Sequence, residues 1–491
     1  MNRTKRRMQT AALAALIGGG ALLPFQAQAA SLAPVANIEA SAATNRSVQY
    51  GEAVNRLIGQ GVLQGYEDGQ IRPDKPVKNA ELLKMVLLAL DLEADGEEGA
   101  QWYDRYVAAA ARHGLIAESD KLAPNAAANS ADMTAFVAKA LQRDVKSVRH
   151  WMDQLAIDGR TVTRGDAAML LVHSQAAIRS ADAKIVSVKA LNNITLEVTF
   201  DSPMTIEDET TAAANENFAF DGGLRLVNQP RLKTGAIATY IVPVVTMTEQ
   251  NYKLSYKGAE QLDVASSSEK LQLNEARQVT ADTFEVDSFR ADGVIDYGYL
   301  ISAYSGGRGA NAVVLGEDNT LDGKPMQIIS SLASRQAVLT PEGGQPITVS
   351  YVGFTQSTDG KQEPKFRLPQ GQTLQPGVKY TVSADWFEAR SASFVAAAVD
   401  PLVIAAAEAV NETTLNVSLS ADPGDELFAY RSVKLEGSDG TSLTAQYKVQ
   451  TRKGETGVFE IQNGGKLLTG VTYKLLPAGA WATSPEITIS L

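Results

Sequence analysis

Hydrophobic residues follow two different periods along the chain. Between residues 48 and 180 they recur every three to four positions, as they do on the buried face of an amphipathic helix. From residue 183 to 491 they alternate with polar residues, as at Leu196, Val198 and Phe200, and Gly, Asn, Asp and Pro mark the turns. The pattern predicts an all-α half followed by an all-β half.

The helical half repeats one unit three times. Each unit joins a short amphipathic helix to a second, more hydrophobic helix, and the second helices begin with similar capping signals. Thr163 is a hydroxyl cap and Asp166 follows it three residues later, and Asn129 and Asp132 keep the same offset. Within a domain at 48–181, the units are expected at about 48–92, 101–143 and 146–180.

The strand half also repeats. "ALNNITLEVTF" (190–200) parallels "AVNETTLNVSL" (409–419), and a tyrosine follows a turn at Tyr252, Tyr380 and Tyr473. A tyrosine shortly after a tight turn, near the start of a late strand, is typical of the tyrosine corner of a β-sandwich. We therefore expect about three immunoglobulin-like sandwiches, of which the middle one is the least regular, at 183–280, 281–399 and 400–491.

The N-terminal residues have the composition of a secretion signal. A basic segment precedes a hydrophobic run at 11–23, and a small-x-small cleavage site follows at 27–29, so residues 1–29 are predicted to be a signal peptide. Arg6-Arg7 offers twin-arginine export as an alternative, but the residues after the pair fit it poorly. Residues 30–47 are small and polar, and we expect a disordered linker there.

Composition narrows the function further. Removing residues 1–29 takes away four basic residues and no acidic ones, so the net charge falls from −11 to −15, which disfavours nucleic acid and anionic membranes as partners. No other hydrophobic run reaches the roughly 18 residues of a membrane span. The chain has no cysteine and only three histidines, which excludes thiol catalysis and leaves little material for a histidine metal site.

The first helical unit carries a recognisable motif. "AVNRLIGQGVLQGYEDGQIRPDKPVKNAELLKMVLLAL" (53–90) resembles the S-layer homology (SLH) domain in its glycine, G-Y-x-D-G loop, R-P-D segment and second helix. The second unit keeps the opening tryptophan, Trp102, and the third keeps only "TRGD" (163–166) of the family's T-R-A-E. The strand half resembles the immunoglobulin-like modules that often follow SLH domains in S-layer proteins.

This resemblance implies a three-pronged helical spindle with binding grooves between the prongs. It also implies a ligand, the secondary cell-wall polysaccharide that is attached to peptidoglycan and commonly carries pyruvate ketals. Those ketals present carboxylates, which a helix N-terminus and an arginine in its first turn can bind. Arg164, directly after the cap Thr163, has this arrangement, although an ordinary solvated arginine would look the same. Its counterparts Asn79 and Ser130 are uncharged, so we expect one carboxylate site instead of three.

The long loop of the first unit supplies further candidates. Gly65 permits a tight backbone, Asp68 can hydrogen-bond within its own loop, and Arg72 can reach a neighbouring groove. Trp102 is either a stacking surface for a sugar or a wedge in the core, with the core favoured. The candidate polysaccharide-binding residues are Arg164, Thr163, Asp166, Gly65, Arg72, Asp68 and Trp102.

Metal and catalytic motifs are incomplete. Residues 91–96 match the first half of an EF-hand loop, but Trp102 stands where the loop needs a bidentate Glu, and 318–322 is similarly incomplete. Structural calcium in the sandwich loops stays open, and no cofactor is expected. The glycine-rich stretch at 304–311 lacks the Lys-Ser/Thr of a phosphate loop, and neither G-x-S-x-G nor H-E-x-x-H occurs.

These observations predict a secreted, non-catalytic protein of the cell wall or S-layer. The helical half would bind wall polysaccharide, and the sandwiches would project outward and could self-associate into a lattice. The alternative is a wall-anchored adhesin whose sandwiches bind a glycan or a host protein, in which case an exposed aromatic row is expected. Trp386 and Trp481 are its candidates, although both also fit a core. A hydrolase within the strand half is a third, weaker reading.

Overall fold

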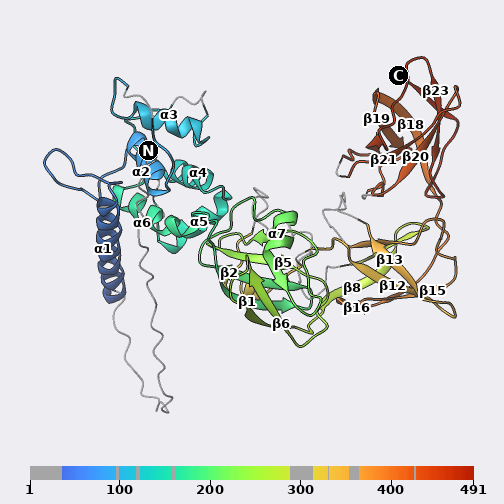
Figure 1. The fold of residues 1–491 in the computed structure, drawn as a ribbon, viewed down its shortest axis with the longest axis horizontal. Helices are drawn as coiled ribbons and strands as arrows, with labels where there is room; N and C mark the ends of the chain where they lie inside the picture. Colours follow the sequence, from blue (N-terminus) through green and yellow to red (C-terminus); the bar gives the residue numbers. More distant parts are fainter. Residues whose placement is uncertain are drawn as a thin grey trace, which may run out of the picture. The chain divides into compact units, whose positions relative to one another are not determined.

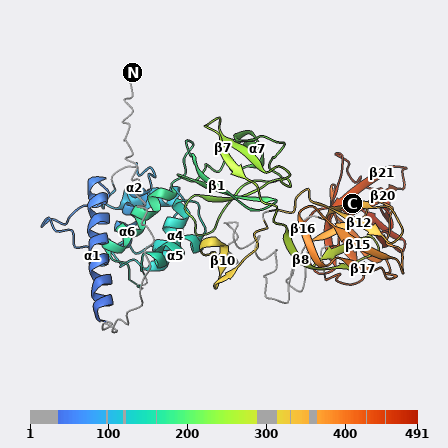
Figure 2. The ribbon, with the colours of Figure 1, turned by 90° about the horizontal axis from the view of Figure 1, so that it is seen from below.

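The computed structural model describes residues 36–95, 99–117, 122–157, 159, 161–287, 313–329, 331–352, 364–424, 427–449 and 451–491. The expected signal peptide and the glycine-rich stretch at 304–311 lie outside these residues. The chain divides into two compact units, Met1–Gln49 and Tyr50–Leu491. Figure 1 shows helices in the first part of the sequence and strands in the rest, and Figure 2 shows the same order from below.

Six α-helices form the three expected helix pairs, which confirms the all-α half. They are α1 (Ala36–Gly59), α2 (Asn79–Ala89), α3 (Asp104–Arg112), α4 (Ser130–Ala140), α5 (Val145–Gln154) and α6 (Arg164–Ser174), with a 3-10 turn η1 at Gln175–Ala177. The linker expectation is wrong in part, because α1 begins at Ala36 and residues 36–47 are helical. That segment is rich in alanine and contains neither Gly nor Pro, so its helix propensity is high.

The three pairs close into a ring just before their second helices. Val77 N donates to Val162 O (2.9 Å), Val162 N to Ala128 O (3.2 Å), and Ala128 N to Val77 O (2.8 Å). Each of these residues lies two positions before the helix that follows it, so one backbone bond per repeat gives the domain its threefold closure. The bonds leave none of these three buried N–H groups unpaired.

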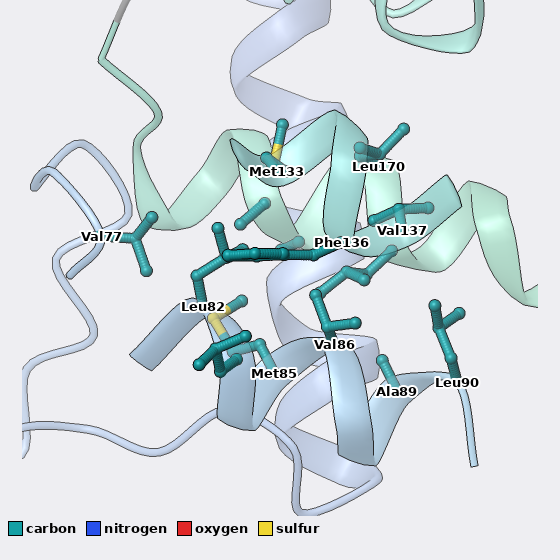
Figure 3. Close-up of a cluster of buried hydrophobic side chains, with 14 of the residues drawn as sticks. Val77, Leu82, Met85, Val86, Ala89, Leu90, Met133, Phe136, Val137 and Leu170 are labelled. Atoms are coloured by element: carbon teal, nitrogen blue, oxygen red, sulfur yellow. The ribbon is translucent and has the colours of Figure 1, made fainter. Parts of the chain in front are cut away.

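Behind this ring the second helices share one hydrophobic core. Leu82 and Val86 of α2 face Phe136 and Val137 of α4 and Leu170 of α6, as Figure 3 shows. The core belongs to all three repeats, because each helix pair alone has too little hydrophobic surface to bury. Trp151 of α5 also belongs to this core, and its side chain is fully buried.

The strand half consists of three sandwich cores, as predicted. The first contains β1 (Ile185–Asn192), β2 (Thr195–Phe200), α7 (Thr211–Asn217), β3 (Phe218–Phe220), β4 (Arg231–Leu232), β5 (Thr239–Pro243), β6 (Asn251–Tyr256) and β7 (Leu262–Ala265). Its two sheets have the orders β1-β2-β5-β4 and β3-β6-β7. A short hairpin, β10 (Thr320–Leu321) and β11 (Lys324–Pro325), follows a 3-10 turn η3 at Glu317–Asn319.

The second and third sandwiches have one topology. The second contains β8 (Leu271–Gln278), β9 (Thr283–Val286), β12 (Gln336–Pro341), β13 (Ile347–Tyr351), β14 (Lys365–Arg367), β15 (Lys379–Ser383), β16 (Phe387–Ser391) and β17 (Ser393–Val395). The third contains β18 (Leu402–Asn411), β19 (Thr414–Leu419), β20 (Ser432–Gly437), β21 (Ser442–Tyr447), β22 (Thr456–Ile461), β23 (Thr472–Pro477), β24 (Ala482–Thr483) and β25 (Ile487–Ser490). The orders β16-β8-β9-β14-β13-β12-β15-β17 and β24-β18-β19-β22-β21-β20-β23-β25 match strand for strand. Contacts between β8 and β17, and between β18 and β25, fold each sheet over on itself.

The boundary between the first two sandwiches lies earlier than predicted. Leu271, Leu273 and Ala276 of β8 belong to the second core, and β8 pairs with β9 and β16. The second sandwich therefore begins by Leu271 and not at 281. Its opening hairpin was visible in the sequence, because "EARQVTADTFEV" (275–286) resembles the hairpins that open the other two sandwiches.

The predicted tyrosine corners are present in all three sandwiches. The Tyr252 hydroxyl accepts hydrogen bonds from Thr248 N (2.7 Å) and Glu249 N (2.8 Å). The Tyr380 hydroxyl accepts one from Gln375 N (2.9 Å), and the Tyr473 hydroxyl accepts one from Leu468 N (3.0 Å). Each bond fixes the turn that precedes a late strand to the strand itself.

Trp386 and Trp481 are core residues, so they form no exposed aromatic row. They are 2% and 6% exposed, and their indole N–H groups donate to Gln336 O (2.8 Å) and Ser432 O (3.2 Å). These acceptors are the first residues of β12 and β20, which occupy the same place in the two sandwiches. The two tryptophans therefore fasten equivalent strands.

Candidate functional site

A groove of about 420 Å³ opens beside the first helix pair. The loop after α1 forms one wall, α2 and the start of α3 form another, and Arg164 of α6 reaches in from the third repeat. Three of the seven candidate residues line it, namely Gly65, Trp102 and Arg164. The ring of backbone bonds explains the meeting, because it brings the start of α6 beside the loop of the first repeat.

Arg164 forms the floor of the groove. Its side chain is buried, Nη2 donates to Gln64 O (2.7 Å), and Nη1 donates to the Tyr66 hydroxyl (3.2 Å). Glu81 Oε2 lies 3.5 Å from Nη1, and the guanidinium lies 4.7 Å from the centre of the Tyr66 ring. Arg164 is thus held by the fold and is not a solvated surface arginine. Its Nε is buried without a hydrogen-bond partner among the described residues.

Thr163 and Asp166 hold the start of α6 in place. Asp166 Oδ2 accepts from the backbone N–H (3.0 Å) and the hydroxyl (2.7 Å) of Thr163, and Thr163 Oγ1 accepts from Asp166 N (3.1 Å). This is the predicted capping box with Asp in place of Glu. Tyr50 donates to the other oxygen of Asp166. Both residues therefore position Arg164 and do not line the groove.

The long loop of the first repeat closes the N-terminus of α6. Arg164 N donates to Lys75 O (3.0 Å) and Gly165 N to Pro73 O (2.8 Å). These are N–H groups that the sequence suggested would be open to an anion, and they are already paired. An anion in the groove would thus meet side chains instead of the helix end.

The three remaining loop candidates have unequal places. A Cβ on Gly65 would lie 3.1 Å from Gly69 O, so the close approach of two backbone segments favours glycine at this position. Asp68 accepts from Gln70 N (3.1 Å) as expected, and this bond lowers the pKa of the Asp68 carboxyl. Arg72 pairs with Asp68 and stacks over Tyr66 at 4.9 Å, and neither Arg72 nor Asp68 lines the groove.

Trp102 is exposed, which contradicts the preference for a core position. Its side chain is 53% accessible, and it contacts Tyr103 and Tyr106 edge to face at 5.6 and 6.3 Å between ring centres. Tyr106, four residues later, is buried instead. A flat indole therefore remains free at the mouth of the groove.

Two cations of the groove were not found in the sequence. Lys84 extends from α2 and donates to Gln64 Oε1 (3.3 Å). Arg105 extends from α3, donates to the Tyr106 hydroxyl (2.7 Å) and stacks on that ring at 4.7 Å. Burial lowers the pKa of the Lys84 ammonium, and the charges of Arg105 and Arg164 lower it further, while Glu81 raises it. Lys84 lies one turn after Glu81, which was the available signal.

The groove carries surplus positive charge. Arg164, Lys84 and Arg105 face a single carboxylate, Glu81. Like charges held this close repel one another, so an anion that enters the groove lowers the electrostatic free energy. The arrangement suits a negatively charged ligand with one flat, hydrophobic face.

The other two repeats do not reproduce this charge. Asn79 and Ser130 stand where the third repeat has Arg164, and Ala135 and Met169 stand where α2 has Lys84. On α6, the residue after Arg164 is Gly165. A Cβ on Gly165 would lie 2.9 Å from the Tyr50 ring, which therefore occupies the space that a larger side chain would need. The surplus charge thus belongs to one groove, and its three cations come from three helices, α2, α3 and α6.

Metal and membrane features are absent from what the structure describes. No group of three or more Asp, Glu or His side chains is placed to hold a metal ion among the described residues. Within the same residues, no helix has the length and hydrophobicity needed to span a bilayer.

The family comparison matches the first repeat. The model of the S-layer homology domain covers residues 46–83, which includes Tyr66 and Glu81 of the groove. The chain carries an S-layer homology domain. Together with the relatives described next, this match indicates a cell-surface protein of the S-layer type.

Two curated S-layer proteins are similar to part of the chain. The S-layer protein sap of Bacillus anthracis is 23% identical over 206 aligned residues, which cover 34% of this chain and 25% of that protein. The S-layer protein of Bacillus thuringiensis subsp. finitimus is 23% identical over 186 residues, which cover 30% and 23%. The match thus spans about a quarter of the length of these curated relatives.

Solved structures of the surface-layer protein SbsC also match over much of the chain. Its domains 1–6 are 12% identical, with coverage of 91% of this chain and 73% of that one and a TM-score of 0.16. The N-terminal part of SbsC is 13% identical, with coverage of 73% and 77% and a TM-score of 0.20. At these TM-scores the superpositions carry no argument about how the domains are arranged.

Proposed function

We propose that this protein is a non-catalytic surface protein which the SLH groove anchors to an acidic cell-wall polysaccharide. The ligand is a polymer that carries carboxylates, such as the pyruvate ketals of a secondary wall polysaccharide. The three sandwiches project outward from that anchor. The single observation behind the proposal is the groove in which Arg164, Lys84 and Arg105 face one carboxylate beside an exposed indole.

Each part of the ligand has a matching side chain. A ketal carboxylate is drawn to the cationic floor, where the buried Nε of Arg164 has no partner among the described residues. The adjacent sugar ring has a hydrophobic face, and Trp102 offers a flat surface for it at the mouth. A neutral polymer would use only the second of these contacts, so charge sets the selectivity.

The same residues support a binding role instead of hydrolysis. Glycoside hydrolysis needs two carboxyl groups on either side of the bond that breaks. Among the described residues, Glu81 is the only acidic side chain lining the groove, and it lies 3.5 Å from Arg164. One carboxyl group cannot supply the pair that this reaction requires.

Lattice assembly is a further part of this proposal. The strands β17 and β25 stand last in the hydrogen-bonded order of their sheets, and the edge of a sheet can join copies of a protein. Assembly would use these edges while the SLH groove remains on the wall.

Co-sedimentation with purified cell walls tests the anchor. The full chain should sediment with intact walls and remain in solution with walls stripped of secondary polysaccharide by mild acid. Lys84→Gln and Trp102→Ala should each weaken sedimentation, because both side chains line the groove without holding the fold. Arg149→Gln, an exposed cation on α5 outside the groove, is the matched control. The proposal would be contradicted if all variants bound equally well, or if the chain bound stripped walls as well as intact ones.

A further inference from the structure

In sandwiches two and three the same turn precedes the third strand, β12 in one and β20 in the other. Ser334 and Tyr430 each stand directly before an arginine, and both have left-handed backbone, with φ of 61° and 58°. In both turns the arginine Nε donates to the carbonyl four residues earlier, Arg335 to Ser331 O (3.3 Å) and Arg431 to Leu427 O (3.4 Å). The left-handed backbone at Ser334 and Tyr430 is therefore a shared feature of the two turns.

The two arginines show what the turn is for. Arg335 Nη2 donates to Val244 O of the first sandwich (2.7 Å). Arg431 donates with both terminal nitrogens to Asp282 of the second sandwich, at 2.6 and 2.7 Å. Each turn thus directs one buried arginine into the preceding sandwich. The turn explains the backbone conformation at positions 334 and 430, but not the choice of side chain.

Tyrosine is unfavourable in the left-handed backbone at position 430, so its presence there calls for a reason other than the turn. A bulky side chain in the left-handed region is strained, whereas a small polar residue such as Ser334 tolerates it better. The Tyr430 side chain is 57% exposed, and no hydrogen bond or ring contact holds it among the described residues. Strain that the fold does not repay is a mark of a functional site.

Tyr430 lies between two adjoining cavities. One holds about 430 Å³ and the other about 460 Å³, and Tyr430, Arg367 and Leu368 line both. The larger part of the polar lining is uncharged, with amides and hydroxyls that include Gln370, Gln372, Thr444 and Gln446 on one side and Thr348 and Ser350 on the other.

The charged residues that line the two cavities balance in number, because Arg367 and Arg431 are matched by Asp282 and Asp400. Arg431 is paired with Asp282, and Arg367 donates to Ala429 O and to the Thr283 hydroxyl (3.1 Å). The cavities therefore offer an anion no surplus of positive charge. What they offer is an exposed aromatic ring with amides and hydroxyls around it.

We propose that the junction of the second and third sandwiches binds a neutral oligosaccharide chain, with one sugar ring stacked on Tyr430. The ring of Tyr430 takes the hydrophobic face of the sugar, and the amides of Gln372 and Gln446 and the hydroxyl of Thr444 bond its hydroxyl groups. The two cavities extend on either side of Tyr430, which accommodates a chain instead of a single sugar. This site is separate from the SLH groove and does not rest on the wall-anchoring proposal.

Affinity electrophoresis of the full chain tests the site. The native gels contain one soluble neutral polysaccharide each, either a β-glucan, a mannan, a galactan or a xylan. We expect the parent chain to be retarded in at least one gel. Tyr430→Asn should bind that polymer more weakly than the parent, by a factor of about ten or more. Tyr430→Phe should keep the retardation, because the ring remains. Ser334→Asn, at the equivalent turn, should bind as the parent does.

Thermal unfolding of the same variants separates binding from folding. Because asparagine tolerates left-handed backbone, Tyr430→Asn should unfold at the same temperature as the parent or at a higher one. A lower unfolding temperature would make Tyr430 a structural residue and overturn the proposal. Retardation of Tyr430→Asn equal to that of the parent, or no retardation of the parent in any gel, would also overturn it.

Two further outcomes distinguish this site from other surfaces. Lys84→Gln should leave the retardation by neutral polymers unchanged, and a loss there would assign the binding to the SLH groove. If Tyr430→Asn changes only the self-association of the chain in size-exclusion chromatography, the junction joins proteins and the glycan site is wrong.

Discussion

The SLH groove and the junction of the second and third sandwiches both depend on arginine, but they balance its charge differently. At the junction, Arg431 meets Asp282 in a two-pronged pair and Arg367 ends on carbonyl oxygens. In the groove, Arg164 shares the single carboxylate of Glu81 with two more cations. A buried arginine with a matched acid fastens two parts of a chain, whereas a cluster with surplus charge is prepared for a ligand.

The pKa values separate the two places in the same way. Burial disfavours the charged form of Asp282, but Arg431 outweighs it and lowers the pKa of the carboxyl to about 2. In the groove, burial and the neighbouring arginines lower the pKa of Lys84, which means that its charged form is less favourable in the folded protein than in water. At the junction the charge of Arg431 is balanced by Asp282, whereas the groove has more positive than negative side chains and lacks a counter-charge.

The largest effect is expected at the junction. Asp282→Ala leaves Arg431 buried without its acid, and breaking such a pair costs about 3–5 kcal/mol of stability. Chemical denaturation of the full chain should show an earlier transition for the strand half. Because the folded-state pKa of Asp282 is lowered to about 2, its contribution is complete above about pH 4 and is lost as the pH falls toward 2. An unchanged transition would mean that Arg431 does not join the sandwiches.

Arg164→Lys should affect both stability and wall binding. A lysine cannot reach Gln64 O and the Tyr66 hydroxyl together, so about 1–3 kcal/mol of stability should be lost. Wall binding should fall by at least tenfold, because the two-pronged donor is gone. Denaturation and co-sedimentation measure the two effects separately. Full binding with reduced stability would assign Arg164 to the fold alone.

Lys84→Gln should weaken wall binding by about tenfold without lowering stability. The lowered pKa means that the charged lysine opposes folding at neutral pH, so removing the charge does not destabilise the helix pair. The comparison with Asp282→Ala is then direct, since one change costs stability and the other costs affinity. A clear drop in the unfolding temperature of Lys84→Gln would contradict this contrast.

Arg72→Gln should have the smallest effect. Arg72 forms an exposed pair with Asp68 and does not line the groove, so wall binding should change by less than about twofold. Co-sedimentation beside Lys84→Gln checks this. A loss as large as that of Lys84→Gln would extend the binding surface over the loop.

Local patterns in the sequence predicted the parts of the fold that depend on neighbouring residues. The helix pairs follow from the spacing of hydrophobic residues and from caps such as Thr163 and Asp166. The tyrosine corners follow from a glycine, such as Gly377 or Gly470, three residues before the tyrosine. Each of these features joins residues only a few positions apart, so the sequence contains the whole signal.

Contacts between distant segments could not be predicted. Lys84 and Arg105 enter the groove because α2 and α3 meet beside Arg164, which is a matter of how the repeats close. The pairing of Arg431 with Asp282 spans 149 positions and has no local signal. The exposure of Trp102 was misjudged for a different reason, because the sequence does not show which of two nearby aromatic residues is buried, and it is Tyr106.

The most direct test of the account uses one polymer in two chemical states. Secondary wall polysaccharide is purified, and part of it is treated so that its carboxylates are reduced to alcohols. Binding of the full chain to both forms is then measured by titration calorimetry at low and high salt. The account predicts binding to the native polymer that weakens with salt, and little binding to the reduced polymer. Equal affinity for the two forms would contradict the claim that the surplus charge of the SLH groove holds the protein to the wall.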